Sequence, residues 1–179
     1  MSWVSLTTEE QVAPETKRIY NFLAQSWGFV PNYFQALGAH PQLLQDQVNL
    51  FTHVMTQDEG RALPRIVREQ VALLVSGINL SNYCLAIHLE ILGRLGIDKK
   101  LSRKLTLDYT TASVEPNVMA LFRFADKLSR HPADMEKSDV DELRKHGWND
   151  EAILETTLVV SLFACANRFS AGIGLVADF

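Results

Sequence analysis

Cys84 and His88 are the two residues of this chain whose types and spacing are best suited to chemistry. On a helix, residues four positions apart lie on the same face, one turn from each other. A cysteine in the first turn of a helix is favoured as the thiolate by free backbone N–H groups and by the helix dipole. The thiolate is the nucleophilic form, and a nearby histidine can share its proton, directly or through water. The pair therefore indicates nucleophilic thiol chemistry.

A third ionisable residue, Glu69, lies on the helix expected before this pair. If the chain folds back at residues 77–81, the carboxylate of Glu69 can reach the same pocket and exchange a proton with His88. Each residue alone has an ordinary structural explanation. A helical cysteine is usually a packed hydrophobe, a lone histidine is usually on the surface or hydrogen-bonded in the core, and Glu69 could be ion-paired. The spacing alone leaves the chemical and the structural explanations open.

The elements that must position these residues are all predicted to be helices. Apolar residues recur at helical spacing between proline and glycine punctuation, and no sustained period-two alternation appears. We expect helices over residues 7–27, 31–37, 41–55, 64–76, 83–95, 98–108, 116–131, 138–146 and 151–170. Asp98, Ser138 and Asn149 are the predicted N-caps. We predict an all-α helical bundle with one domain over residues 1–179, of which residues 1–27 form an N-terminal helical extension.

Composition excludes several classes of function. The net charge of −4 is spread without a strongly basic segment, so we expect no binding to nucleic acid or to an anionic membrane. The N-terminus lacks the pattern of a signal peptide. The most apolar windows, around residues 71–80 and 157–166, are about half as long as a bilayer-spanning helix. We therefore expect a cytoplasmic protein.

The chain has two cysteines and five histidines. In a reducing compartment a disulfide between Cys84 and Cys165 is not expected. Cys165 lies within an apolar stretch, residues 159–165, and we expect it to be buried by packing. Apart from Cys84 and His88, no cysteine or histidine pair has metal-ligand spacing. There is also no glycine-rich phosphate loop. We therefore predict no metal or nucleotide cofactor.

The segment from Glu69 to His88 resembles the signature of the alkylhydroperoxidase D (AhpD) and carboxymuconolactone decarboxylase family. That signature is a glutamate, eleven residues, and then Cys-x-x-Cys-x-x-x-His. Here eleven residues separate Glu69 from Ser81, and the signature continues as Ser81-x-x-Cys84-x-x-x-His88. Similarity to the peroxidase-related branch extends over about residues 28–175, including Gly-Phe-Val-Pro-Asn at 28–32, the helix at 121–128 and the closing helix at 147–169. The resemblance implies an AhpD-like fold.

The resemblance also implies roles for the site residues. Cys84 would attack the O–O bond of a peroxide, with His88 and Glu69 as its proton relay. The first cysteine of the family resolves the resulting sulfenic acid as a disulfide, and Ser81 cannot do so. An external thiol, or another cysteine of the assembly, would then be required. Serine is also a good N-cap, so Ser81 has a purely structural explanation as well.

Three functions remain open at this point. The first is a thiol peroxidase acting on hydrogen peroxide or alkyl hydroperoxides, which the Glu69–Cys84–His88 register favours. The second is an acid–base lyase on a small acid, like the carboxymuconolactone decarboxylases, in which Glu69 and His88 carry catalysis and Arg65 or Arg168 contacts the substrate. The third is a family member without catalysis.

Further residues and an assembly state are predicted around this site. Tyr83, Asn167 and Arg168 are candidates for the pocket wall. A homo-oligomer is expected, because the family is generally oligomeric. The chain is also rich in apolar helices and carries several tryptophans and phenylalanines, more than one small bundle easily buries.

Overall fold

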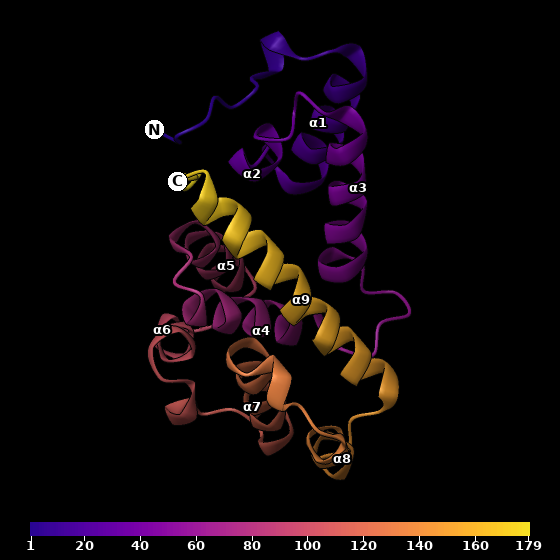
Figure 1. Cartoon of the computed structure of the whole chain (residues 1–179), viewed down its shortest axis with the longest axis vertical. Helices are drawn as coiled ribbons and strands as arrows, with labels where there is room; N and C mark the ends of the chain where they lie inside the picture. The colour runs from indigo at the N-terminus through magenta and orange to yellow at the C-terminus, as the bar shows by residue number, and fades with distance from the viewer.

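The structure is a computed structural model that describes all residues from 1 to 179, and it consists of nine α-helices without a β-strand (Figure 1). The prediction of an all-α fold is confirmed. The helices are α1 (Pro14–Trp27), α2 (Asn32–Gln35), α3 (Pro41–Phe51), α4 (Arg65–Ile78), α5 (Asn82–Arg94), α6 (Lys99–Leu107), α7 (Pro116–Arg130), α8 (Lys137–Lys145) and α9 (Asp150–Gly172).

Two of the predicted helix starts differ from the structure. Residues 9–11 form only a 3₁₀ turn and Ala13 is extended, so α1 begins at Pro14 rather than at residue 7. The N-cap of α8 is Glu136, not Ser138. Asp98 and Asn149 cap α6 and α9 as predicted, since their side chains accept hydrogen bonds from the backbone N–H groups of Lys100 and Ala152.

Helix α4 lies at the centre of the bundle and packs against α5, α6, α7 and α9 (Figure 1). Every residue from Val67 to Gly77 is buried, as expected for a segment whose apolar residues cover more than one face. Gly77 allows a close approach of α6, because a Cβ there would lie 3.1 Å from the backbone of Thr106. The residues of α4 therefore have fixed positions relative to all the surrounding helices.

A tight turn joins α4 to α5. The backbone N–H groups of Leu80 and Ser81 donate to the carbonyls of Gly77 and Ser76 at 3.1 and 3.0 Å. Leu80 has the left-handed φ of 54° that this turn requires, at a cost of roughly 1–2 kcal/mol for a non-glycine residue. The turn reverses the chain so that α5 packs along α4.

The buried guanidinium of Arg68, a residue of α4, binds the segment that follows α3. That segment continues α3 as one turn of π-helix, Thr52–Thr56. Nη1 of Arg68 donates to the carbonyls of Val54 and Gln57 at 2.9 and 2.8 Å, and Nη2 forms an ion pair with Asp58. Arg68 itself is only 1% exposed, so its guanidinium depends on these partners rather than on solvent.

We expect Arg68→Met to lower the free energy of unfolding by about 3 kcal/mol, because it removes the buried donor shared by two backbone carbonyls and the partner of Asp58. Urea denaturation followed by circular dichroism measures the change. Arg103→Met, at an exposed position of α6, is the matched control and should stay within ~0.5 kcal/mol of the unmodified protein. Equal stabilities of the two variants would contradict this role of Arg68.

Helix α9 crosses the whole bundle (Figure 1). By length and composition alone it could span a membrane, yet half of its most apolar stretch is buried inside the bundle. Its buried side contacts α4, α5 and α7. This burial is what a core helix of a bundle requires.

Candidate active site

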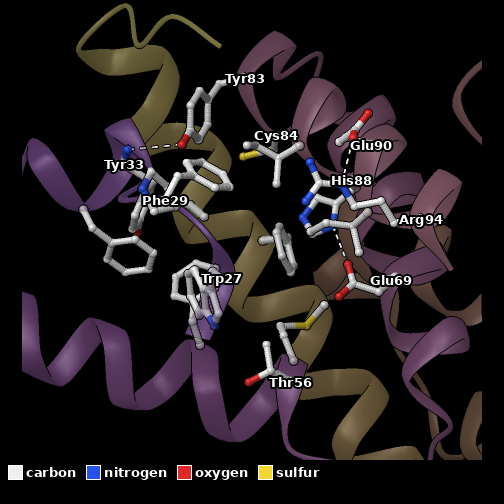
Figure 2. A pocket seen from close by; sticks show the side chains of 18 of the residues that line it. Trp27, Phe29, Tyr33, Thr56, Glu69, Tyr83, Cys84, His88, Glu90 and Arg94 are labelled. Atoms are coloured by element: carbon white, nitrogen blue, oxygen red, sulfur yellow. Dashed lines mark hydrogen bonds and ion pairs between the residues drawn. The ribbon is translucent and has the colours of Figure 1, made fainter. Parts of the chain in front are cut away.

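A cavity of about 320 Å³ lies between α1–α3 on one side and α4, α5 and α9 on the other (Figure 2). Most of its wall is apolar and aromatic. Its polar lining residues include the predicted catalytic residues Glu69, Cys84 and His88. Residues 1–27, expected as an N-terminal extension, contribute Trp27 to this wall, and α1 packs against α3.

Cys84 is the third residue of α5 and is 4% exposed. Its Sγ lies 3.8 Å from Oγ of Ser170 on α9, and the Ser170 hydroxyl donates to the carbonyl of Ala166 at 2.8 Å. With the hydroxyl proton committed to that carbonyl, the thiol must be the donor in its contact with Ser170. In this arrangement the hydroxyl oxygen of Ser170 accepts a hydrogen bond from the neutral thiol. To donate to a thiolate instead, the Ser170 hydroxyl would have to rotate away from the carbonyl of Ala166.

The start of α5 leaves its free N–H groups without a side-chain cap. Ser81 occupies the N-cap position, as we expected if its role were to cap α5. Its side chain nevertheless makes no capping hydrogen bond. Its Oγ is buried without any hydrogen-bond partner. The positive end of the helix dipole therefore acts on Cys84 without being offset by a capping oxygen.

Glu69 and His88 form a buried pair, with Oε2 of the carboxylate 2.7 Å from Nδ1 of the imidazole. They are 1% and 5% exposed. A carboxylate on Nδ1 fixes the ring and leaves Nε2 as the nitrogen free to exchange a proton. Figure 2 shows His88 between Glu69 and Cys84. The structure thus brings Glu69, Cys84 and His88 together in one cavity. Their proximity results from the turn that folds α5 back along α4.

His88 is not hydrogen-bonded to Cys84 directly, so a proton passing between them needs a water or a substrate oxygen in the cavity. Both side chains line that cavity. The Phe163 ring and the imidazole pack nearly perpendicular to each other, with 4.5 Å between ring centroids. This contact restricts the imidazole from the side of α9.

Tyr83 lines the cavity as predicted, but its hydroxyl is used to hold the C-terminal segment. It donates to Oδ2 of Asp178 at 2.8 Å and accepts from the backbone N–H of Tyr33 at 3.1 Å. Asp178 also accepts from the backbone N–H of Asn32 at 2.7 Å. Burial, together with the charge of Asp178, raises the pKa of Tyr83, so this hydroxyl remains protonated as a donor.

The prediction that Asn167 and Arg168 form part of the pocket is wrong. Asn167 is buried, but it faces α4, where it accepts from Asn79 at 2.9 Å and donates to Ser76 at 3.1 Å. Arg168 is exposed and donates to the carbonyl of Ala164 on its own helix. The rotation of about 100° per helical residue explains this result, because Ala166 lines the cavity and the next two positions turn away from it.

The prediction that Cys165 is buried is also wrong, since this thiol is exposed. The stretch around it is apolar on nearly all faces, and the sequence did not show which face of α9 the bundle leaves uncovered. Cys165 does not line the cavity. It therefore does not present its sulfur to Cys84 within the chain.

Sequence reasoning missed most of the cavity wall. Four ring contacts form a continuous aromatic wall, with centroid distances of 5.3 to 6.0 Å along Trp27–Phe34–Phe51–Phe163 and then the 4.5 Å contact to His88. These rings come from α1, α2, α3 and α9, which are far apart in the chain.

Of the two arginines considered as substrate contacts, Arg65 lines the cavity, with Nε 3.7 Å from Oε1 of Glu69.

Solved structures of other proteins share the fold of this chain. No protein-family model matches the chain, and no curated protein matches its sequence. A peroxidase-related protein of uncharacterised function from Silicibacter sp. TM1040 is 26% identical, with a TM-score of 0.89 over 98% of this chain and 91% of that one. An uncharacterised peroxidase-related protein from Ralstonia eutropha JMP134, described as an alkylhydroperoxidase AhpD core, is 23% identical, with a TM-score of 0.88 over the same shares.

A third solved structure shows that this fold supports more than one activity. It is a cysteine-to-alanine variant of the debrominase Bmp8 in complex with 2,3,4-tribromopyrrole. It is 21% identical, with a TM-score of 0.80 over 97% of this chain and 92% of that one. The protein described here therefore has the AhpD-like all-α fold, which occurs in peroxidase-related proteins and in a debrominase.

Proposed function

We propose that this protein is a thiol-dependent peroxidase that reduces organic hydroperoxides at Cys84. The observation that carries the proposal is the cavity shared by a buried thiol and a buried Glu69–His88 pair whose Nε2 is free. Buried ionisable pairs beside a nucleophile are typical of functional sites. The fold of the peroxidase-related proteins supports the same assignment.

In the first step, the Cys84 thiol gives its proton to His88 through a water or through the bound hydroperoxide. The thiolate then attacks the outer peroxide oxygen, an S–O bond forms and the O–O bond breaks. The alkoxide that leaves takes the proton back from His88 and departs as the alcohol. The products are Cys84 sulfenic acid and one alcohol, so the sulfur loses two electrons and the peroxide gains them. Glu69 stabilises His88 while it carries the extra proton.

In the second step an external thiol reduces the sulfenic acid. It condenses with Cys84 to a mixed disulfide and releases water, and a second thiol restores the Cys84 thiol and leaves as a disulfide. The chain itself supports no other route, because Ser81 has no sulfur and Cys165 does not line the cavity. A thiol-rich cytoplasm would supply this reductant.

The aromatic wall favours a hydroperoxide with an apolar body. Burying a phenyl-sized group contributes about 1.5–3 kcal/mol, which is worth roughly 10- to 100-fold in kcat/KM. We expect turnover of cumene hydroperoxide with dithiothreitol, at a kcat/KM at least ~10-fold above that for hydrogen peroxide. Peroxide consumption is compared with a control that contains the hydroperoxide and dithiothreitol but no protein. Consumption of cumene hydroperoxide no faster than in that control would reject the proposal.

A second candidate is reductive debromination, favoured by the aromatic wall beside Cys84 and by the debrominase with the same fold. The Cys84 thiolate would take bromine from an electron-rich ring, while a proton replaces it on the ring carbon. The resulting sulfenyl bromide would react with an external thiol to give a mixed disulfide and HBr. Bromide release from 2,3,4-tribromopyrrole in the presence of dithiothreitol tests this candidate, and absence of release above the protein-free rate rejects it.

A further inference from the structure

Helix α9 exposes one stripe of side chains along its full length. The exposed positions follow one another at intervals of three and four, which is the spacing of a coiled-coil seam. Leu154 and Leu158 are 60% and 41% exposed. No helix lies in front of α9 in the view of Figure 1. The stripe, here called the α9 seam, consists of Glu151, Leu154, Leu158, Ser161, Cys165 and Arg168.

The two ends of the α9 seam carry opposite charges that have no ion-pair partner in the chain. Glu151 begins the seam and makes no salt bridge or side-chain hydrogen bond. Arg168 ends it, and its guanidinium bonds only to the carbonyl of Ala164 on the same helix. Between these charges, two large apolar residues are followed by two small ones.

We propose that the α9 seam binds the α9 seam of a second copy of this chain, with the two helices antiparallel. Antiparallel pairing places Glu151 opposite Arg168 of the second copy at both ends, whereas parallel pairing would place like charges together. The register in which these charges meet also sets Leu154 against Cys165 and Leu158 against Ser161 of the second copy. Large residues thus face small ones, which lets the helices approach to about 8 Å.

This proposal is independent of the chemistry at Cys84, and it assigns a surface to the homo-oligomer expected from the sequence. An antiparallel arrangement also aligns the two helix dipoles favourably. The two-fold axis passes between positions 159 and 160. Since both seams are the same surface, the contact closes as a dimer and does not propagate.

Sedimentation velocity tests the surface. We expect the unmodified protein to be a dimer and Leu158→Glu to be a monomer at the same concentration, with unchanged helicity by circular dichroism. Leu107→Glu, at an 80% exposed leucine of α6, is the matched control and should remain a dimer. A monomeric unmodified protein, or a dimer that survives Leu158→Glu, would overturn the proposal.

Charge reversal tests the orientation. Arg168→Glu places two acidic groups at each end of the antiparallel pair, and we expect it to weaken the dimer by about 10-fold in Kd. Adding Glu151→Arg in the same chain restores opposite charges and should recover that loss. If the second substitution does not recover the affinity, the antiparallel pairing is wrong.

Cross-linking tests the register in a background with Cys84→Ser and Cys165→Ser. Adding Ser161→Cys places two thiols about 4.5 Å apart along the helix axes, within reach of a short bis-maleimide. In the matched protein that keeps only Cys165, the thiols are about 16 Å apart along the axes and should not be linked. Linkage through Cys165 but not through Ser161→Cys would contradict the register.

Discussion

We expect Cys84→Ala to abolish the proposed thiol-dependent peroxide reduction, with a loss on the order of 10³-fold or more in kcat/KM. No other thiol lines the cavity, so the variant has no nucleophile for the O–O bond. The substitution exchanges one small buried side chain for another, so the aromatic wall and the Glu69–His88 pair should persist. The measurement is peroxide consumption with dithiothreitol at cumene hydroperoxide concentrations below KM, where the rate reports kcat/KM.

Cys165→Ala is the matched control, since it removes the exposed thiol and leaves the buried one. It should keep the activity of the unmodified protein. If Cys84→Ala instead keeps full activity on the physiological substrate, the chemistry belongs to Glu69 and His88, as in the acid–base lyase considered from the sequence. The comparison of the two variants thus separates nucleophilic from acid–base catalysis.

The second large effect is a gain of chemistry in Ser81→Cys. Ser81 and Cys84 are the N-cap and third residues of α5, and side chains three apart on a helix have Cβ atoms about 5–6 Å from each other. Modest adjustment brings this within the range of a disulfide. The hydroxyl of Ser81 is buried and unpartnered, so its replacement by sulfur breaks no hydrogen bond.

After one equivalent of cumene hydroperoxide, we expect Ser81→Cys to lose two thiols and about 2 Da in intact mass, as the new cysteine resolves the Cys84 sulfenic acid. Its turnover with dithiothreitol should exceed that of the unmodified protein, because the intramolecular step replaces encounter with an external thiol. Ser81→Ala should show neither change. Retention of a free thiol at position 81 after oxidation of Cys84 would count against the geometry.

The proximity of the three candidate residues could be predicted from the sequence because they are local. Cys84 and His88 are one helical turn apart, and Glu69 needs only a single fold-back to meet them. The helix boundaries also followed from local signals such as Pro41, Pro116 and the cap residue Asn149, whereas Thr7 and Ser138 resembled starts that the chain does not use.

What the sequence could not predict depends on which face of a helix meets which neighbour. Helix α9 is apolar on almost every side. Its pattern therefore did not show that Ser170 faces the Cys84 thiol while Cys165 faces outward from the bundle. Phe51 ends α3 and Phe163 lies in the middle of α9. Their contact in one wall follows only from the packing of the end of α3, and of the π-helical turn after it, against α9. The misassigned residues Asn167 and Arg168 share this cause.

The central claim is that Cys84 is the thiol that reacts with peroxide, and mass spectrometry of both cysteines after titration with cumene hydroperoxide tests it most directly. We expect dimedone to label sulfenic acid at Cys84 at one equivalent of peroxide, while Cys165 remains a free thiol although it is the more exposed of the two within a single chain. Oxidation of Cys165 with Cys84 unchanged at excess peroxide would contradict the account.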